Sequence, residues 1–521
     1  MRRPVVLAVL DGWGISAARE GNAIALARKP HLDAYEAEYP HTRLSASGAD
    51  VGLIPGQMGN SNVGHLNLGA GRIVYQDLGR ISKAIETGAF DANEALRTAM
   101  LRLVGGQALH LMGLLSDGGV HSHEEHVFAL LRLAKSLGVK RVFVHAFLDG
   151  RDVPPRSAER YLARLEQEMG ALGVGRVATV QGRFYAMDRD QRWDRIERAY
   201  AALVRGEGEP VGSAAEALAR AYARGESDEF VQPAVVIGDD ARPVGPIRSG
   251  DSVILWNFRA DRAREITHAL TDPDFDAFAR RVWPVVHYVT MTMYEAGLHV
   301  NGIAFPPPPP MHNILGEWLA AFGARQLRIA ETEKYAHVTY FFNGGREDPY
   351  PGEDRVLIPS PKVATYDAVP GMSAPEVTAA LLERLRSGVY DCVILNYANC
   401  DMVGHTGVLA AAIRAVEVVD ECLGQVVDEV RDLGGAVLIV SDHGNAEEMV
   451  DPDGKPHTAH TANPVPCILV DDRRRAATLR PGILADVAPT LLELLELPIP
   501  PEMEGRSLIV NGPDTGTGFC S

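Results

Sequence analysis

Short, continuously apolar runs recur along the chain, and each is followed by a small group of polar residues. The first, Val5–Leu10, is rich in β-branched residues and is followed at once by Asp11. An apolar run without alternation is typical of a strand buried on both faces of a parallel sheet. Six later runs are also largely apolar and are followed by polar residues, at residues 109–115, 142–148, 177–180, 252–256, 392–397 and 437–440. Because helical patterns separate them, we predict an α/β fold.

Amphipathic helices are predicted between these runs. Ser122 followed by Glu125 fits a capping box, and apolar residues from 127 to 133 continue a helix from that start. The clearest helical pattern has apolar residues on one side between 413 and 430. Gly434 is expected to end that helix, since glycine is the usual residue just beyond a helix C-terminus.

A domain boundary is indicated by five consecutive prolines at residues 306–310. Such a run is stiff and extended and cannot join a sheet. Two or more domains are expected in a chain of 521 residues, because single domains usually have about 100–150 residues. Residues after 510 are rich in Gly, Thr and Ser and are predicted to form a frayed tail.

Composition and charge indicate which partners and which cellular compartment to expect. Lys and Arg total 51 against 68 Asp and Glu, a formal charge of −17, so we expect no nucleic-acid or anionic-membrane partner. A local arginine cluster could still hold a small anionic substrate. The five cysteines include no C-x-x-C pair, so neither a zinc ribbon nor a thioredoxin motif is predicted. Five is also a poor count for a disulfide framework, which favours a reducing compartment. The N-terminal apolar run is too short for a signal peptide and no run of 18 apolar residues occurs, so a cytoplasmic protein is expected.

The segment Gly56 to His65 contains three glycines, two asparagines and Ser61. Its composition predicts an open loop and not a helix, because glycine permits conformations closed to other residues. Ser61 is expected to be exposed there and positioned as a nucleophile or a metal ligand. A plain surface turn is the alternative reading.

Four groups of Asp and His residues follow apolar runs or lie in nearby loops. Ligand sites in α/β sheets lie at the carboxyl ends of strands. Carboxylates and imidazoles together suit Mn²⁺ or Zn²⁺, and six such ligands are enough for two ions, a common arrangement in phosphoryl chemistry. Each group alone could be an ordinary turn. The candidate ligands are Asp11, Asp401, His405, Asp442, His443 and His460.

Arginines follow three of the predicted strands between about residues 140 and 265. They lie in the segments 149–152, 181–190 and 257–262. Arginines gathered at strand ends can grip an anion with planar, bidentate hydrogen bonds. A single cluster could equally be a set of solvated side chains, which is a weaker explanation for three clusters.

Taken together, these motifs closely resemble those of the cofactor-independent phosphoglycerate mutases, members of the alkaline phosphatase superfamily. The resemblance covers almost the whole chain. The matching segments are 10–14, 56–64, 116–122, 145–152, 187–193, 257–264, 336–345, 357–367, 396–407, 442–447 and 501–505.

The resemblance implies an alkaline-phosphatase-like α/β domain with an inserted α/β transferase domain. The phosphatase-like, metal-binding domain would comprise residues 1–75 and 311–510. The inserted domain, which would bind the substrate, would comprise residues 78–305. Residues 511–521 would form the flexible tail.

The resemblance also implies two Mn²⁺ ions, with Zn²⁺ or Co²⁺ as substitutes. One ion would be held by Asp401, His405 and His460, and the other by Asp11, Ser61, Asp442 and His443. Ser61 would be the nucleophile that carries phosphate, Asp152 a proton shuttle and Lys334 a further catalytic residue. The substrate site would be lined by His121, Arg151, Asp152, Arg183, Arg189, Arg259, Arg262 and Lys334.

The implied activity interconverts 3-phosphoglycerate and 2-phosphoglycerate through a phosphoserine, in glycolysis and gluconeogenesis, without 2,3-bisphosphoglycerate. The enzyme would be a monomer. A metal-dependent phosphomonoesterase or a phosphopentomutase of the same superfamily are the alternatives, and the intact candidate ligands argue against a non-enzymatic scaffold. Three positions depart from the family pattern. Asn62 replaces the usual Glu, Cys400 replaces the usual Pro and could make the site oxidation-sensitive, and Ile54-Pro55 replaces Pro-Glu.

Overall fold

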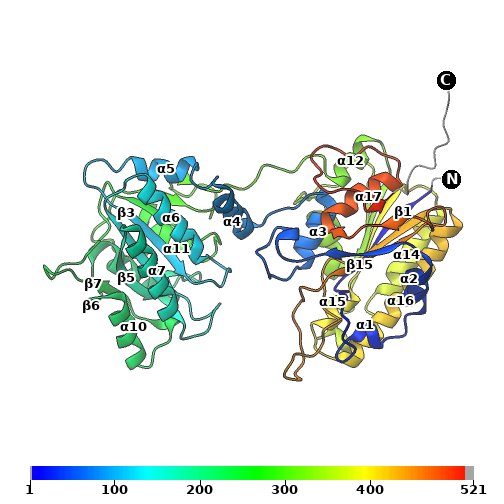
Figure 1. Cartoon of the computed structure of the whole chain (residues 1–521), viewed down its shortest axis with the longest axis horizontal. Helices are drawn as coiled ribbons and strands as arrows, with labels where there is room; N and C mark the ends of the chain where they lie inside the picture. Colours follow the sequence, from blue (N-terminus) through cyan, green and yellow to red (C-terminus); the bar gives the residue numbers. More distant parts are fainter. Residues whose placement is uncertain (1–2, 511–521) are drawn as a thin grey trace. The chain divides into compact units, whose positions relative to one another are not determined.

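The chain folds as two units, one of which is built from both ends of the sequence (Figure 1). The computed structural model describes residues 3–510. The first unit joins Met1–Gln76 to Pro309–Ser521, and the second is Asp77–Pro308. One crossing between the units therefore falls inside the proline run. The tail expected at residues 511–521 lies outside the described residues.

The first unit is organised on an eight-stranded sheet of order β12-β11-β13-β1-β14-β15-β2-β17. The strands from β12 to β14 run parallel, and β15 is antiparallel to both of its neighbours. The bounds are β1 Val5–Leu10, β2 His41–Ser45, β11 Gln326–Glu331, β12 Glu353–Ile358, β13 Cys392–Tyr397, β14 Ala436–Val440, β15 Val465–Val470 and β17 Gly482–Ile483. A small separate sheet pairs β16 Thr478–Leu479 with β18 Ile509–Val510.

Helices cover both faces of this sheet, so its central strand is buried on both sides. Every residue of β1 is buried, as its continuous apolar run predicts. Alternate β1 residues pack into two separate hydrophobic clusters, Val6 in one and Leu7 in the other. The helices on the Val6 side are α2 (Pro30–Glu38), α14 (Ala374–Arg386) and α16 (Leu409–Asp432). Those on the Leu7 side are α3 (Ser61–Ala70), α12 (Leu315–Ala321) and α17 (Val487–Leu494).

The second unit has its own eight-stranded sheet, of order β10-β9-β8-β3-β4-β5-β7-β6. All neighbouring pairs are parallel except β5 with β7. The bounds are β3 Leu109–Leu115, β4 Val142–Leu148, β5 Arg176–Gly182, β6 Glu209–Val211, β7 Ala234–Val236, β8 Ser252–Leu255, β9 His287–Thr290 and β10 Gly302–Ile303. Its main helices are α4 Asp77–Thr87, α5 Glu94–Leu101, α6 Glu124–Ser136, α7 Ala158–Leu172, α9 Trp193–Tyr200, α10 Ala214–Ala223 and α11 Arg264–Thr271.

All seven predicted apolar runs are strands of these two sheets, so the predicted α/β class is confirmed. The predicted end of the long helix is also confirmed, since α16 stops at Asp432 and Gly434 has a φ of +68°. The predicted capping box is wrong. Helix α6 is capped by His123, and the Ser122 hydroxyl donates instead to the Leu114 carbonyl O at 2.6 Å.

Two further sequence expectations concern membranes and cysteines. Within residues 3–510, no helix combines the length and the apolar character that crossing a membrane requires. The four cysteines of the described region are free thiols, and all are buried.

His126, on helix α6, is a buried histidine without polar partners. Its side chain is fully buried, and neither ring nitrogen has a hydrogen-bond partner. Burial, and secondarily the nearby His123, lowers the pKa of His126 to about 3. The folded protein therefore holds this imidazole neutral over the range in which an unfolded histidine, with a pKa of about 6.5, takes up a proton.

This difference predicts a loss of stability in acid. Below about pH 6.5 the unfolded chain binds a proton that folded His126 does not, which lowers the free energy of unfolding by about 2 kcal/mol at pH 5. His126→Leu should remove this contribution, so urea unfolding at pH 7 and pH 5 should show a smaller acid loss than in wild type. His299→Asn, which alters a histidine exposed by 58% on the same unit, should behave like wild type. An unchanged acid loss in His126→Leu would contradict the assignment.

Candidate active site

Ser61 is the first residue of helix α3, which Asn60 caps by accepting a backbone N–H. The glycine-rich segment therefore leads into a helix, which corrects the expectation of an open loop. Ser61 is also buried, with only 6% of its surface exposed, and so is not the exposed serine that was expected. The cause is tertiary, because Lys334 and His443 contact its hydroxyl from other strand ends.

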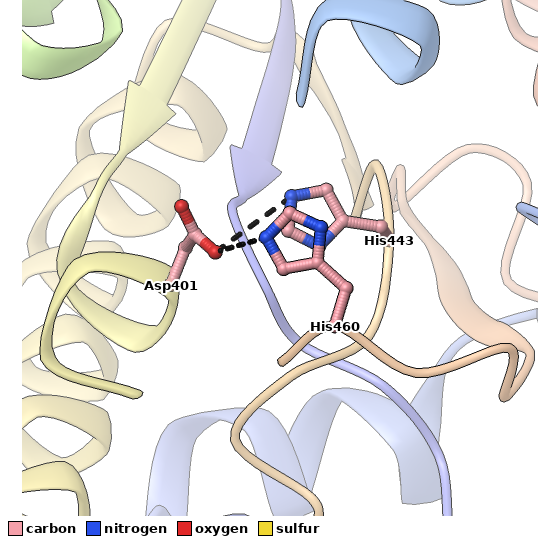
Figure 2. Close-up of side chains that lie close together, drawn as sticks. All are labelled: Asp401, His443 and His460. Atoms are coloured by element: carbon pink, nitrogen blue, oxygen red, sulfur yellow. Dashed lines mark hydrogen bonds and ion pairs between the residues drawn. The ribbon is translucent and has the colours of Figure 1, made fainter. Parts of the chain in front are cut away.

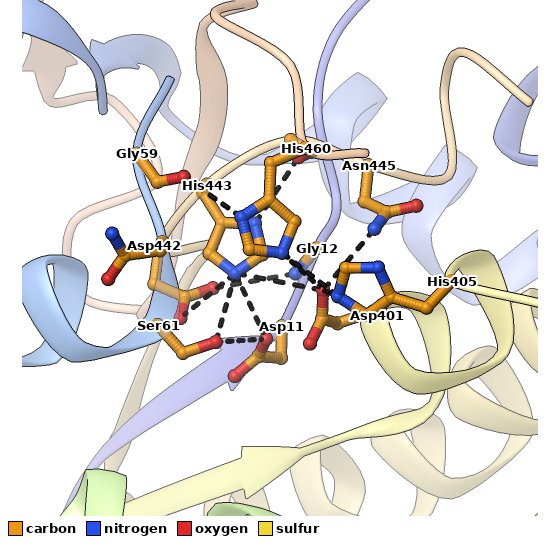
Figure 3. A network of polar contacts seen from close by, with 12 residues as sticks. Asp11, Gly12, Gly59, Ser61, Asp401, His405, Asp442, His443, Asn445 and His460 are labelled. Carbon is orange, nitrogen blue, oxygen red and sulfur yellow. Dashed lines mark hydrogen bonds and ion pairs between the residues drawn. The ribbon is translucent and has the colours of Figure 1, made fainter. Parts of the chain in front are cut away.

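The Ser61 hydroxyl contacts three charged groups from distant segments. Its Oγ lies 3.2 Å from Asp11 Oδ1 and 3.0 Å from His443 Nε2 (Figure 3). Lys334 Nζ donates to the same Oγ at 2.7 Å. A hydroxyl between a cationic donor and an acceptor carboxylate has the surroundings that activate a serine nucleophile.

Lys334 also joins two carboxylates that belong to different strands. Its Nζ lies 2.7 Å from Asp11 Oδ1, after β1, and 2.5 Å from Asp401 Oδ2, after β13. All three side chains are almost fully buried. Burial alone would lower the pKa of Lys334, but these carboxylates raise it above its ordinary value. Lys334 is therefore a buried ammonium.

The same charges control the ionisation of the acids and of His443. Burial would raise the pKa of Asp11 and Asp401, but the Lys334 ammonium holds both well below their usual range. Burial would lower the pKa of His443, but the carboxylates of Asp442, Asp11 and Asp401 raise it to about 10. The region is a dense network of ionised side chains held away from water.

Three imidazoles of this site lie near one carboxylate oxygen, Asp401 Oδ1. His460 Nε2 lies 3.0 Å and His443 Nε2 3.9 Å from Asp401 Oδ1 (Figure 2). His405 Nε2 lies 3.1 Å from the same oxygen and 3.0 Å from His460 Nε2. Two imidazole nitrogens this close to each other and to a carboxylate form a ready set of metal ligands.

Backbone carbonyls orient the three rings. The Nδ1 atoms lie near carbonyl oxygens, at 2.7 Å for His405 with Thr458, 2.9 Å for His460 with Gly59 and 3.2 Å for His443 with Gly444. A neutral imidazole with its proton on Nδ1 satisfies its carbonyl and leaves Nε2 free for a metal ion, so His443 must lose its second proton to act as a ligand. This is the orientation in which a metal-ligating histidine is normally held.

The donor set fits divalent metal ions. Two groups have ligand atoms close enough to share an ion, Asp401 with His443 and His460, and Asp11 with His65 and Asp442. The buried Asp442 Oδ2 accepts no well-aligned hydrogen bond, although His65 Nδ1 lies 3.1 Å away, so it can still serve as a metal ligand. All seven predicted ligands meet here, but the two groups are divided differently from the expected pairing. His443 Nε2 accounts for part of the difference, since it lies between Asp11 and Asp401.

Sequence reasoning missed two buried residues of this network, His65 and Asn396. Asn396 Nδ2 donates to Asp11 Oδ2 at 2.8 Å and lies 3.0 Å from His65 Nε2. His65 Nδ1 hydrogen-bonds the Ser61 carbonyl O at 3.0 Å and lies 3.1 Å from Asp442 Oδ2. The helical spacing of four residues between Ser61 and His65 was the available signal, because it places both on one helix face.

Two of the departures from the family pattern can now be placed. Cys400 is 1% exposed, and burial raises the pKa of its thiol. The thiolate is the reactive form of cysteine, so the expected sensitivity to oxidation is not supported. Asn62 Oδ1 accepts from His337 Nε2 at 2.9 Å, which gives Asn62 a local structural role.

In the second unit, the predicted substrate residues lie at strand ends of its sheet and are tied together by carboxylates. Arg183 is 2% exposed and lies 2.8 Å from Asp149 Oδ1 and 2.5 Å from Asp152 Oδ2. Arg151 is 56% exposed on its side chain and pairs with Glu229 at 3.5 Å. The arginines thus differ in how much of the guanidinium remains open to solvent.

Asp261 is a residue of this cluster that sequence reasoning missed. Its carboxylate lies 2.9 Å from Arg189 Nη1, 3.1 Å from Arg259 Nε and 3.5 Å from His121 Nδ1. Arg262 Nη1 donates to the Met187 carbonyl O at 3.0 Å. Asp261 lies within an arginine-rich motif, where a single acid is easily taken for a surface ion pair.

Burial and crowded positive charge shift the pKa of two residues in the second cluster. Burial, followed by the positive charges of Arg183 and Arg189, lowers the pKa of Arg262. Burial and the adjacent Arg183 also lower the pKa of His121 to about 4, which keeps that imidazole neutral near pH 7. Crowded guanidinium groups favour the binding of an anion, which reduces their mutual repulsion.

The chain thus has two α/β units, one with a buried serine among carboxylates and imidazoles and one with clustered arginines. The family model described as "BPG-independent PGAM N-terminus" matches residues 81–296. The 2,3-bisphosphoglycerate-independent phosphoglycerate mutase of Moorella thermoacetica is 59% identical, over 98% of this chain and 99% of that protein. That of Symbiobacterium thermophilum is 58% identical, over 98% of both chains.

A solved structure agrees with these relatives. The phosphoglycerate mutase of Leishmania mexicana, whose structure is described as determined at low cobalt concentration, is 36% identical, with a TM-score of 0.58 over 98% of both chains. The chain belongs to the 2,3-bisphosphoglycerate-independent phosphoglycerate mutases. The fold class that the resemblance implied is thereby confirmed.

The position of Lys334 predicts how stability depends on metal. In metal-free protein, Lys334→Met leaves buried Asp11 and Asp401 without their cation, which should cost about 3–5 kcal/mol in free energy of unfolding. A bound divalent cation would restore positive charge, so the loss should shrink when Mn²⁺ is added. Unfolding of chelator-treated and Mn²⁺-supplemented samples measures both values. Lys362→Met, at an exposed lysine, is the matched control. An equal loss with and without metal would contradict this role for Lys334.

Proposed function

We propose that this chain is an isomerase that interconverts 3-phosphoglycerate and 2-phosphoglycerate through a phosphoserine at Ser61. Membership of the mutase family supports the reaction. The observation that carries the mechanism is the buried Ser61 hydroxyl in contact with Lys334, Asp11 and His443. The reaction would serve glycolysis and gluconeogenesis and would need no 2,3-bisphosphoglycerate.

The donor set supports two Mn²⁺ ions, with Zn²⁺ or Co²⁺ as substitutes. We assign Asp401, His405 and His460 to one ion, and Asp11, Ser61, Asp442 and His443 to the other. When bound, the ions would supply Lewis-acid stabilisation of the serine oxygen and of the phosphate.

The protein side chains prepare the serine for attack. Ser61 Oγ can donate its proton toward Asp11 Oδ1, while Lys334 Nζ donates to Ser61 Oγ. The ammonium therefore favours the deprotonated oxygen and then stabilises the charge that develops on the transferred phosphoryl group. After Ser61 takes the phosphoryl group, glycerate leaves with a free hydroxyl and must be held until the group returns to its other oxygen.

The arginine cluster of the second unit supports binding of an anionic phosphoglycerate. Arg151, Arg189 and Arg259 each expose about half of the side chain, at 56%, 44% and 47%. They can donate to carboxylate or phosphate oxygens in bidentate fashion. Arg183 fixes the Asp152 carboxylate, which we propose moves the proton between the glycerate hydroxyls. The full proposed set is His121, Arg151, Asp152, Arg183, Arg189, Arg259, Arg262 and Lys334.

We further propose that the unit with both chain ends binds the metals and that the inserted unit binds the substrate. The enzyme would act in the cytoplasm as a monomer. The four buried free thiols support a reducing compartment. Its partners would be 3-phosphoglycerate and 2-phosphoglycerate, with no nucleic acid and no membrane.

Replacement of the nucleophile tests this proposal. Ser61→Ala should lower mutase activity more than about 10³-fold, because no other group carries the phosphate. Activity is measured by coupling to enolase without added 2,3-bisphosphoglycerate. Wild type should lose the same activity to a chelator and regain it with Mn²⁺, and mass spectrometry of quenched wild type should find phosphate on Ser61. Ser387→Ala, at an exposed serine, should stay fully active. Wild-type turnover in Ser61→Ala would exclude a phosphoserine mechanism.

The fate of the phosphate separates a mutase from a phosphatase. Wild type should return phosphate to glycerate and release little inorganic phosphate, since it must retain glycerate during the reaction. Arg151→Ala should slow this return more than it slows phosphorylation of Ser61, so a larger share of turnovers ends in hydrolysis. The ratio of inorganic phosphate to 2-phosphoglycerate measures that share. Arg220→Ala, on the exposed face of α10, should leave the ratio unchanged. Phosphate as the main wild-type product would favour a phosphomonoesterase.

A further inference from the structure

Glu447 is a buried carboxylate, outside the predicted ligand set, that accepts hydrogen bonds from separate segments of the chain. It is 1% exposed. Its Oε2 accepts the backbone N–H groups of Gly14 at 3.0 Å and Asn445 at 2.8 Å. Its Oε1 accepts the Thr461 hydroxyl and, at 3.0 Å, the Asn463 amide. Four donors thus satisfy both oxygens of one carboxylate away from water.

The three segments that meet at Glu447 are those that carry most of the predicted metal ligands. The loop after β1 supplies Gly14, the loop after β14 supplies Asn445, and a third loop supplies Thr461 and Asn463. Asn445 also reaches the ligand Asp401, since its Nδ2 lies 3.3 Å from Asp401 Oδ1. The ligands on the three segments are Asp11, Asp442, His443 and His460.

The local sequence is fitted to this carboxylate. A Cβ at Gly14 would lie 2.2 Å from Glu447 Cδ, and a Cβ at Gly444 would lie 2.4 Å from Glu447 Oε1. Neither distance is possible between non-bonded atoms, so both loops need glycine for the carboxylate to approach the backbone. A backbone bridge between Gly444 and Thr461 joins two of the loops directly at the same place.

We propose that Glu447 is a positioning residue that holds three ligand-bearing loops in the arrangement that binds metal. The proposal rests on the proposed metal-dependent function. Both oxygens of the carboxylate are needed, because each faces two donors. A glutamine offers one oxygen and one NH₂ group, so two of the four donors would face another donor. Unpaired buried donors force their loops to move, and the ligands on those loops move with them.

Metal affinity distinguishes this role from a general contribution to stability. A structural residue would lower the melting temperature of metal-free protein while leaving the affinity of the folded protein for Mn²⁺ unchanged. A positioning residue changes the affinity itself. Substitution of groups that orient metal ligands typically weakens metal binding about 10–100-fold.

The decisive experiment is calorimetric titration of the metal-free full chain with Mn²⁺ at 25 °C. Glu447→Gln should bind Mn²⁺ about 10–100-fold more weakly than wild type. Its activity should recover at high Mn²⁺, with an unchanged KM for 3-phosphoglycerate. Gly14→Ala, which displaces the carboxylate without removing it, should weaken binding similarly. Glu448→Gln is the matched control, because this neighbouring glutamate is exposed; it should bind as wild type does.

The outcomes separate this inference from the proposed function. Wild-type affinity in a folded Glu447→Gln variant would overturn the inference alone. Absence of Mn²⁺ binding in wild type would remove the proposed metal site and the inference with it. If Glu447→Gln does not fold, the Mn²⁺ affinity of Thr461→Val tests the inference instead. That substitution deletes one side-chain donor and leaves the carboxylate in place. Several-fold weaker Mn²⁺ binding by that variant supports the role of Glu447, and unchanged binding overturns it.

Discussion

Several carboxylates must stay ionised at the buried carboxyl ends of the central strands of the first sheet. This requirement determines which side chains surround them in the active-site region. Asp11, Asp401 and Asp442 are each no more than 3% exposed. An ionised carboxylate without water costs several kcal/mol unless cations and hydrogen bonds compensate. The Lys334 ammonium supplies such a cation to Asp11 and Asp401, and the side-chain amides of Asn396 and Asn445 donate to the same two carboxylates. Ionised carboxylates are ligands that divalent cations bind, which a neutral polar pocket would not offer.

Sheet topology brings these charges together. Strand β1 lies between β13 and β14, with Leu10 beside Tyr397 and Val9 beside Val440. The residues that follow these three parallel strands therefore emerge next to one another. The adjacent strand β11 leads into the short helix that carries Lys334. The apolar strands and the helices on both faces of the sheet make the carboxyl ends of these strands rigid. This rigidity keeps the like charges at fixed distances.

Local sequence pattern was enough to predict the seven continuously apolar strands and the polar residues at their ends, because both depend on neighbours in the chain. It could not predict that Ser61 is buried. That burial depends on Lys334 and His443, which lie 273 and 382 residues away in sequence. For the same reason His65 and Asp261 were missed. The helical spacing from Ser61 to His65 and the arginine-rich motif around Asp261 were weak signals, because the partners that give each residue its role come from distant parts of the chain.

The two units bring together side chains of opposite charge. The first unit has a cluster of carboxylates that requires cations. The second unit has a cluster of arginines whose charge is partly compensated by acidic residues. In the second unit, Arg183 is buried against Asp149 and Asp152, so its charge is already neutralised. Arg189 and Arg259 share the single carboxylate of Asp261 and remain about half exposed. The acids of the cluster therefore determine how much of each guanidinium group remains open to solvent.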